Sequence, residues 1–201
     1  MLRLGFLASH RGSNMQAVVD ACGAGRIRAL PAVVISNNRS AQVLRRAESA
    51  GIPGYCLNSD THPEPKDLDR SILETLTLHK VALVVLTGYL KRVGPETLAA
   101  FKGRMINIHP SLLPRHGGRG MYGLRVHEAV LAAGDRVTGV TIHYVTTEYD
   151  RGTVLAQRTV PVEPGDTPET LAERVLVVEH ELLVETVGSI ALEHEQAGER
   201  A

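Results

Sequence analysis

The chain has 201 residues, 43% of them hydrophobic, and its 22 basic residues balance 22 acidic ones. This size and composition predict one domain, residues 1–201, with a single buried core. The balanced charge argues against nucleic acid and anionic membranes as partners, and no apolar run approaches the roughly 20 residues of a membrane helix. Cys22 and Cys56 lie far apart, outside any CxxC spacing, so we expect a protein of the reducing cytoplasm.

The first half of the chain alternates apolar runs with amphipathic stretches. Continuous apolar runs predict buried strands, and apolar residues at helical spacing predict helices. Strands are expected at residues 2–8, 30–36, 55–57 and 81–86, and helices at 13–22, 41–50, 67–79 and 95–100. This alternation is typical of an α/β protein with an open, doubly wound, mostly parallel sheet covered on both faces by helices.

The pattern changes after a further strand at residues 105–109. A loop at 117–123 has four glycines among seven residues, and we expect it to be a mobile flap. A helix is expected at 124–133. It is followed by two strands, at 139–145 and 154–160, which a polar turn joins and which could pair antiparallel as an addition to the sheet.

The C-terminal part predicts one long helix. Thr167 and Pro168 fit the N-cap and the first helical residue, and the apolar pattern continues to about Val187. Residues 191–201 are mostly polar and are expected to form a frayed tail.

An anion site is predicted between the first strand and the first helix. Residues 9–14 occupy the position where a doubly wound sheet presents free backbone amides at a helix N-terminus. Arg11 adds positive charge and Gly12 permits close approach to the backbone, while Ser13 and Asn14 add polar groups. A dinucleotide fingerprint is excluded because only one glycine of the GxGxxG spacing is present. The alternative is that Ser13 merely caps the helix.

A second candidate site lies at the end of the strand at residues 105–109. Asn107 and His109 are two residues apart, so their side chains project together from an extended strand. Transfer of an acyl group to an amine needs an oxyanion donor, a proton carrier and a group that orients the carrier. Asn107, His109 and Asp150 supply these three groups. The carboxylate would raise the pKa of His109 and favour its cationic form.

Ordinary explanations stand beside these interpretations. His109 could be a hydrogen-bonded histidine at a strand end, and Asp150 an ordinary turn residue. His143 could be buried and structural or could touch a ligand, and Glu179 could be only a helix-surface charge. The histidines do not form familiar ligand spacings with cysteine or carboxylate residues, so we expect no metal.

The segment Asn-Ile-His-Pro-Ser-Leu-Leu-Pro at residues 107–114 resembles the signature of the folate-dependent formyltransferases. Further segments resemble this family in chain order: Ser9 with Gly12-Ser13-Asn14 and Gln16, then residues 88–91, 139–145, 149–152 and 179–180. The similarity covers roughly residues 2–190. It implies a Rossmann-like formyltransferase fold in which residues 1–103 bind the substrate phosphate and residues 104–190 bind folate and carry out the reaction.

The resemblance implies that the formyl group of 10-formyltetrahydrofolate passes directly to the amine of 5'-phosphoribosylglycinamide in purine biosynthesis, without a metal. It assigns the catalytic roles to Asn107, His109 and Asp150. The substrate-binding residues that it implies are Arg11, Gly12, Ser13, Asn14 and Glu179. The folate-binding residues that it implies are Tyr89, Leu90, Lys91, Val93, Asn107, His143 and Asp150. The expected partners are therefore small molecules, with the protein as a monomer or homodimer.

Two features depart from the family pattern. His10 and Arg11 replace residues that are often glycine or asparagine, and Arg125 stands where a second histidine is common, so no role is assigned to Arg119 or Arg125. A formyltransferase for another small amine, such as an amino sugar, and a non-catalytic folate- or nucleotide-binding module are alternatives. A tRNA formyltransferase would need a further basic domain, and a formyltetrahydrofolate hydrolase an N-terminal regulatory domain.

Overall fold

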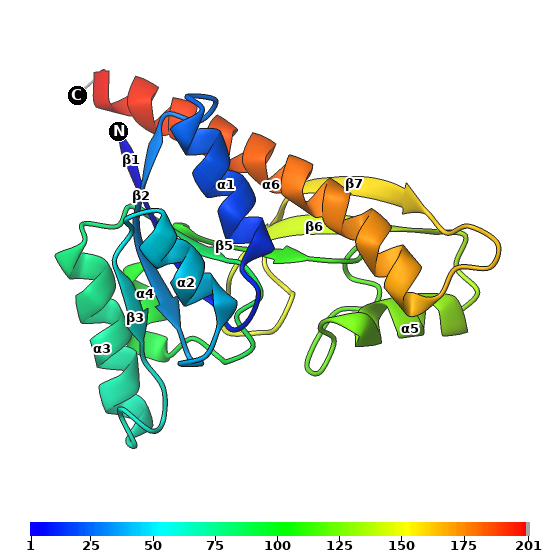
Figure 1. The fold of residues 1–201 in the computed structure, drawn as a ribbon, viewed down its shortest axis with the longest axis horizontal. Helices are drawn as coiled ribbons and strands as arrows, with labels where there is room; N and C mark the ends of the chain where they lie inside the picture. Colours follow the sequence, from blue (N-terminus) through cyan, green and yellow to red (C-terminus); the bar gives the residue numbers. More distant parts are fainter. Residues whose placement is uncertain (200–201) are drawn as a thin grey trace.

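The computed structural model describes residues 1–199, whose helices and strands are drawn in Figure 1. Seven strands form one sheet in the order β3-β2-β1-β4-β5-β6-β7. The elements are β1 Leu2–Ala8, α1 Ser13–Gly23, β2 Ala29–Ser36, α2 Gln42–Ser49, β3 Gly54–Cys56, α3 Pro65–Leu78, β4 Leu83–Leu86, α4 Pro95–Ala100, β5 Met105–His109, α5 Leu124–Ala132, β6 Val137–Tyr144, β7 Val154–Pro161 and α6 Pro168–Glu199.

The sheet has the predicted doubly wound, mostly parallel topology. Strands β3, β2, β1, β4 and β5 pair in parallel, whereas β6 pairs antiparallel with both β5 and β7. The strand order reverses between β1 and β4. Ligands bind outside the carboxyl ends of the strands at such a reversal, because the loops diverge there and leave a crevice. The antiparallel addition and the long C-terminal helix are also confirmed.

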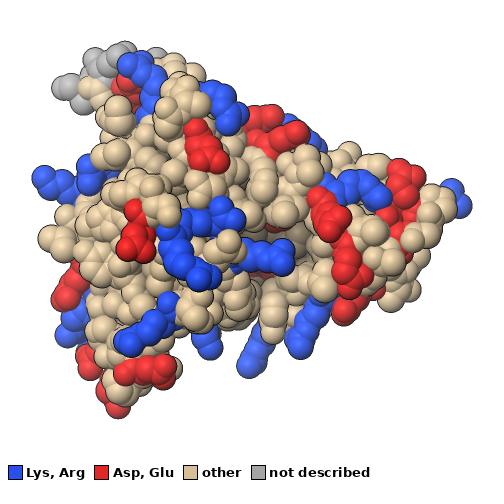
Figure 2. Space-filling view, in the orientation of Figure 1, with Lys and Arg blue, Asp and Glu red and all other residues tan. Residues whose placement is uncertain are grey.

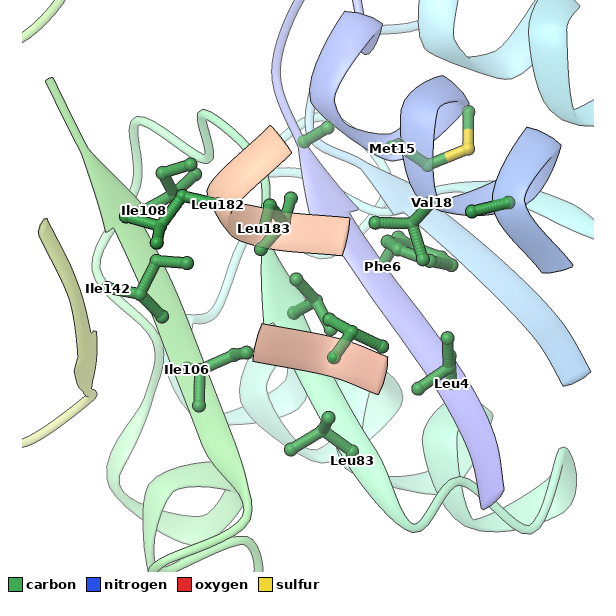
Figure 3. Close-up of a cluster of buried hydrophobic side chains, with 14 of the residues drawn as sticks. Leu4, Phe6, Met15, Val18, Leu83, Ile106, Ile108, Ile142, Leu182 and Leu183 are labelled. Carbon is green, nitrogen blue, oxygen red and sulfur yellow. The ribbon is translucent and has the colours of Figure 1, made fainter. Parts of the chain in front are cut away.

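Helices cover both faces of the sheet and divide the core into two clusters. Side chains from α1, α2, α5 and α6 pack on one face, and side chains from α3 and the segment after α4 pack on the other. Figure 3 shows the first cluster, where strand residues meet α1 and α6. Its labelled residues are Leu4, Phe6, Met15, Val18, Leu83, Ile106, Ile108, Ile142, Leu182 and Leu183. Burying each large apolar side chain contributes about 1.5–3 kcal/mol.

Strand β5 is placed so that its polar residues face away from that cluster. Ile106 and Ile108 are buried in it, so the alternation along the strand directs Asn107 and His109 to the opposite side. This confirms the expectation that the two polar side chains share one face.

Helix α6 is longer than the sequence predicted. It begins at Pro168 as expected, and the amide of Thr170 donates to Oγ1 of Thr167 over 3.3 Å as an N-cap bond. It continues beyond Val187 to Glu199, because Val187 and Ala191 are one helical turn apart and both are buried. The expected frayed tail at 191–201 is therefore wrong for residues 191–199, which are helical, and residues 200–201 lie outside the described part of the chain.

The surface carries both signs of charge. Acidic and basic side chains are interspersed over the face shown in Figure 2, with a group of basic side chains near the N-terminal end of α1. Among residues 1–199, no helix combines the length and the apolarity needed to cross a bilayer.

Candidate active site

A cavity of about 640 Å³ lies at the carboxyl ends of β4 and β5 and beside the N-terminus of α1. The residues proposed from the sequence as site residues all line it, with the exception of Gly12. They are Arg11, Ser13, Asn14, Tyr89, Leu90, Lys91, Val93, Asn107, His109, His143, Asp150 and Glu179. Residues separated by as much as 168 positions in the chain therefore meet in one place.

Gly12 shapes the turn rather than the cavity wall. Its backbone is left-handed, with φ 70°, and a Cβ at this position would collide with the side chain of Val43 in α2. No side chain within residues 1–199 caps α1, so the alternative in which Ser13 is merely a cap is not supported. The first amides of α1 and the side chains of Ser13 and Asn14 are therefore left for a ligand, as an anion site requires.

The turn after β1 is tied to the segment after β4. The amide of Ser9 donates to the carbonyl of Gly88 over 3.0 Å, and the amide of Leu90 donates to Oγ of Ser9 over 2.8 Å. These bonds fix the predicted folate segment beside the predicted anion turn. Within that segment, burial raises the pKa of Tyr89 to about 12, so its hydroxyl stays protonated.

Asn107 is held by His143 on the neighbouring strand. The two residues lie opposite each other in the β5–β6 pairing, and Nδ2 of Asn107 is 3.1 Å from Nε2 of His143. Nδ1 of His143 donates to the carbonyl of Tyr144 over 2.9 Å, which leaves Nε2 to accept from the amide of Asn107. One N–H of Asn107 is thus occupied, and the other is available to a bound molecule.

The position of the proton on His109 follows from its hydrogen bond. Nε2 lies 2.9 Å from the carbonyl oxygen of His116, and because a carbonyl can only accept, Nε2 carries the proton. Nδ1 lies 3.7 Å from Oδ2 of Asp150. In the neutral ring, Nδ1 is therefore an unprotonated base beside a carboxylate.

Asp150 lies between the two histidines. Its Oδ2 accepts from the amide of Gly118 over 2.7 Å, and its Oδ1 is 3.5 Å from Nε2 of His143. Burial opposes ionisation of Asp150, but the adjacent His143 and His109 rings and the Gly118 amide together lower its pKa. The carboxylate is therefore ionised at neutral pH.

The expectation that His109 would be cationic is wrong for the free protein. Burial lowers the pKa of His109 below its usual range and outweighs Asp150, which raises it. The ring is only 4% exposed, so the loss of hydration exceeds the attraction of a carboxylate that it does not touch directly. His109 is consequently neutral at neutral pH.

Glu179 connects α6 to the anion turn. Nδ2 of Asn14 donates to Oε1 of Glu179 over 3.3 Å, while Oδ1 of Asn14 is buried without a hydrogen-bond partner among the described residues. Burial raises the pKa of Glu179 to about 7 despite this bond. Asn14 and Glu179 thus form a polar pair in the cavity wall, and the hydrogen bonds that the described residues make to this pair are incomplete.

Glu179→Gln is expected to raise the melting temperature by a few degrees at pH 8 and to leave it unchanged at pH 5. The unfolded carboxyl loses its proton near pH 4.5 and the folded one near pH 7, so unfolding of the native protein releases a proton between these values. The free energy of unfolding therefore falls as pH rises across that interval. Thermal melts from pH 5 to 8 measure the effect. Glu193→Gln, on the exposed side of α6, is the control. If the melting temperatures of the native protein and of both variants depended on pH in the same way, the raised pKa of Glu179 would be contradicted.

Three residues of this site carry no clear signal in the sequence. His116 and Gly118 hold His109 and Asp150 through backbone groups, which composition does not reveal. His127 is 4% exposed and lines the cavity, and burial followed by the charge of His109 lowers its pKa to about 4. A lone histidine within a predicted helix carries no functional signal of its own in the sequence.

A second hollow of about 540 Å³ adjoins the mouth of the cavity. Its charged lining consists of Arg92, Arg119 and Arg151 with Glu148, which leaves an excess of positive charge. The guanidinium of Arg92 donates to the carbonyl of Thr147 over 2.9 Å and is thereby held at the rim. Within residues 1–199, no group of three or more histidine, cysteine or acidic residues is placed to hold a metal ion.

An amide, an imidazole and a carboxylate that converge where the strand order of a doubly wound sheet reverses define a site for group transfer. The family described as formyl transferase matches residues 2–187, and the chain belongs to this family. The resemblance inferred from residues 107–114 is thereby confirmed.

Three relatives show which members of the family the chain is similar to. Phosphoribosylglycinamide formyltransferase of Arabidopsis thaliana is 41% identical over 193 residues, which cover 95% of this chain and 66% of the relative. The protein of that name from Escherichia coli is 36% identical over 174 residues, covering 87% of this chain and 80% of the relative. The crystal structure of glycinamide ribonucleotide transformylase 1 from Symbiobacterium toebii has a TM-score of 0.90 at 39% identity and covers 96% of this chain and 89% of that chain. The chain thus spans just under two thirds of the plant relative and most of the bacterial ones.

Proposed function

We propose that this protein transfers the formyl group of 10-formyltetrahydrofolate to the amine of 5'-phosphoribosylglycinamide, a step of purine biosynthesis. The proposal rests on the convergence of Asn107, His109 and Asp150 in the same cavity as the uncapped N-terminus of α1. The names of the relatives support the same acceptor and the same transferred group. A non-catalytic binding module would have no need of an ionised Asp150 beside an unprotonated imidazole nitrogen.

The acceptor binds at the turn between β1 and α1. Its phosphate lies against the free amides of α1, with Ser13 and Asn14 as further hydrogen-bonding groups and Arg11 as a counter-charge. Glu179 accepts from a hydroxyl of the sugar, which replaces the hydration that the buried carboxylate lacks. Residues 1–103 thereby form the phosphate-binding half of the domain.

The donor lies along the segment after β4. Its pterin packs against the wall formed by Tyr89, Leu90, Lys91 and Val93, with His143 and Asp150 nearby. The carboxylates at its glutamate end fit the positively charged hollow at the mouth of the cavity. Because residues 89–93 belong to the first half of the chain, the folate site draws on both halves, while the catalytic groups come from residues 104–190.

The reaction follows from the hydrogen bonds of the site. The free N–H of Asn107 stabilises the formyl oxygen as the amine adds to the formyl carbon and negative charge develops. Nδ1 of neutral His109 accepts the proton that the amine loses and later delivers it to the departing nitrogen of the folate. Ionised Asp150 stabilises the imidazolium that forms in between. Holding both substrates in one cavity lowers the barrier further.

The acceptor is tested by following tetrahydrofolate release from 10-formyltetrahydrofolate. We expect release with 5'-phosphoribosylglycinamide, little release with phosphorylated amino sugars, and little without an acceptor. Release with an amino sugar alone would replace the proposed acceptor, and release without any acceptor would indicate a hydrolase. Donor binding without release under every condition would indicate a binding module.

We further propose that the protein acts in the cytoplasm as a monomer or homodimer. Cys22 and Cys56 are both free thiols, as is usual for proteins of a reducing compartment. Light scattering coupled to size-exclusion chromatography distinguishes the two assembly states, and localisation of the tagged full chain tests the compartment.

A further inference from the structure

The carbonyl that accepts from His109 belongs to a residue whose own side chain is anchored elsewhere. Nε2 of the His116 ring lies 2.7 Å from Oδ2 of Asp135, and Nη2 of Arg115 lies 2.6 Å from Oδ1 of the same carboxylate. The side chains of His116 and Asp135 are only 14% and 11% exposed. Asp135 thus holds two consecutive residues at the start of the glycine-rich loop.

The backbone of His116 needs such an anchor. Its φ is 51°, in the left-handed region that disfavours residues with a β-carbon. Without a fixed side chain, the peptide could relax toward a more common conformation and turn its carbonyl away from His109. The hydrogen bond from His116 is the largest cause of the lowered pKa of Asp135, so the anchor is an ionised carboxylate.

The loop that follows makes the anchor more important. Residues 117–123 contain four glycines, and Gly118, Gly120 and Gly123 also have positive φ. Such a segment resists rotation of the preceding peptide only weakly. The Asp135 contact, made to the turn before β6, therefore fixes the orientation of His116 independently of this loop.

We propose that His116 and Asp135 are positioning residues that hold the His116 carbonyl on Nε2 of His109 and so keep the proton off Nδ1. If the carbonyl were withdrawn, Nε2 would lose its acceptor and the neutral ring could carry its proton on Nδ1, beside Asp150. A ring in that state has no lone pair on the side of Asp150. The consequence for turnover rests on the proposed function, whereas the position of the proton does not.

Two substitutions of His116 separate the anchor from the backbone conformation. Glutamine is long enough for its side-chain amide to reach Asp135, whereas asparagine is too short but is better tolerated at positive φ. If the anchor matters, His116→Gln retains function and His116→Asn loses it. If only the backbone conformation matters, the order is reversed.

The first readout is the ¹⁵N NMR spectrum of histidine-labelled full-length protein, in which the loss of one ring in His109→Gln assigns the His109 signals. We expect a single Nε2–H tautomer in the native protein and in His116→Gln, and a mixture of tautomers in His116→Asn. This measurement needs no substrate, so it stands if the proposed reaction is wrong. A single Nε2–H tautomer in His116→Asn would overturn the proposal.

The second readout is kinetic. His116→Asn is expected to lower kcat about tenfold or more, because a positioned acid–base group contributes about 10²–10⁴-fold and a misplaced proton on His109 forfeits part of this, with KM for both substrates changed less than about twofold. His116→Gln is expected to stay close to the native protein. A rise in KM at constant kcat would instead indicate a role in binding and would overturn the proposal.

Asp135→Ala provides a second route if a His116 variant fails to fold. It removes the anchor while leaving His116 in place, and we expect the same mixture of tautomers and the same fall in kcat. Arg158→Gln is the matched control, because it removes a contact of 2.6 Å to Glu185 on the far strand and helix. An unchanged tautomer in folded Asp135→Ala, or an equal effect of Arg158→Gln, would overturn the proposal.

Discussion

Asp150→Asn is expected to lower kcat by about 10²–10⁴-fold while donor binding stays close to the native value. Asparagine keeps the shape of the side chain, tolerates the left-handed backbone at φ 55° and can still accept from the amide of Gly118. What it removes is the negative charge beside His109 and His143. The imidazolium that forms during proton transfer then has no counter-charge in a buried site.

For Asp150→Asn, single-turnover formyl transfer measures the rate of the chemical step. A separate titration with a folate analogue measures donor binding. Asp60→Asn, in an exposed turn, is the matched control for the same chemical change. Near-native turnover in Asp150→Asn would show that the carboxylate has no part in proton transfer. A parallel loss of analogue binding would show that its role lies in holding the donor.

Asn107→Leu is expected to lower kcat by about 10²–10³-fold, the usual effect of removing one donor to an oxyanion. Leucine is close to asparagine in shape, so β5 is retained, but the N–H that stabilises the developing charge is lost. The substitution also leaves Nε2 of His143 without its donor at 3.1 Å. The effect on kcat should therefore exceed the effect on KM for the folate.

His143→Gln separates these two consequences of Asn107→Leu. The side-chain oxygen of the introduced glutamine can still accept from Asn107. The oxyanion donor is thus retained while the imidazole is removed. Steady-state kinetics should show a smaller loss than for Asn107→Leu. Equal losses in the two variants would mean that the pair acts as a single structural unit, and the specific role of the Asn107 N–H would be wrong.

Much of the fold could be predicted because its signals are local. Apolar runs located the strands of the parallel part, and Thr167 with Pro168 located the start of α6. The end of α6 could not be located, because polar residues after Val187 obscured a buried Ala191 whose partners are distant in sequence. A polar tail and the outer face of a packed helix have the same composition.

The site was predictable where side chains act directly. The spacing of Asn107 and His109 implied a shared face, and the strand ends implied a cleft. The protonation of His109 was not predictable, because it depends on how deeply the ring is buried and not only on the neighbouring Asp150. The contact of Asp135 with His116 was equally hidden, since 19 residues separate them and backbone groups transmit their effect.

Ser9 joins the turn proposed to hold the acceptor phosphate to the segment proposed to line the folate through two hydrogen bonds, one to Gly88 and one from Leu90. We therefore expect a displacement of either segment to be shared by the other, so that the two proposed substrates influence each other's binding. Whatever factor the acceptor imposes on the affinity for folate, folate must impose the same factor on the affinity for the acceptor. Ser9 is the residue through which that coupling would be changed.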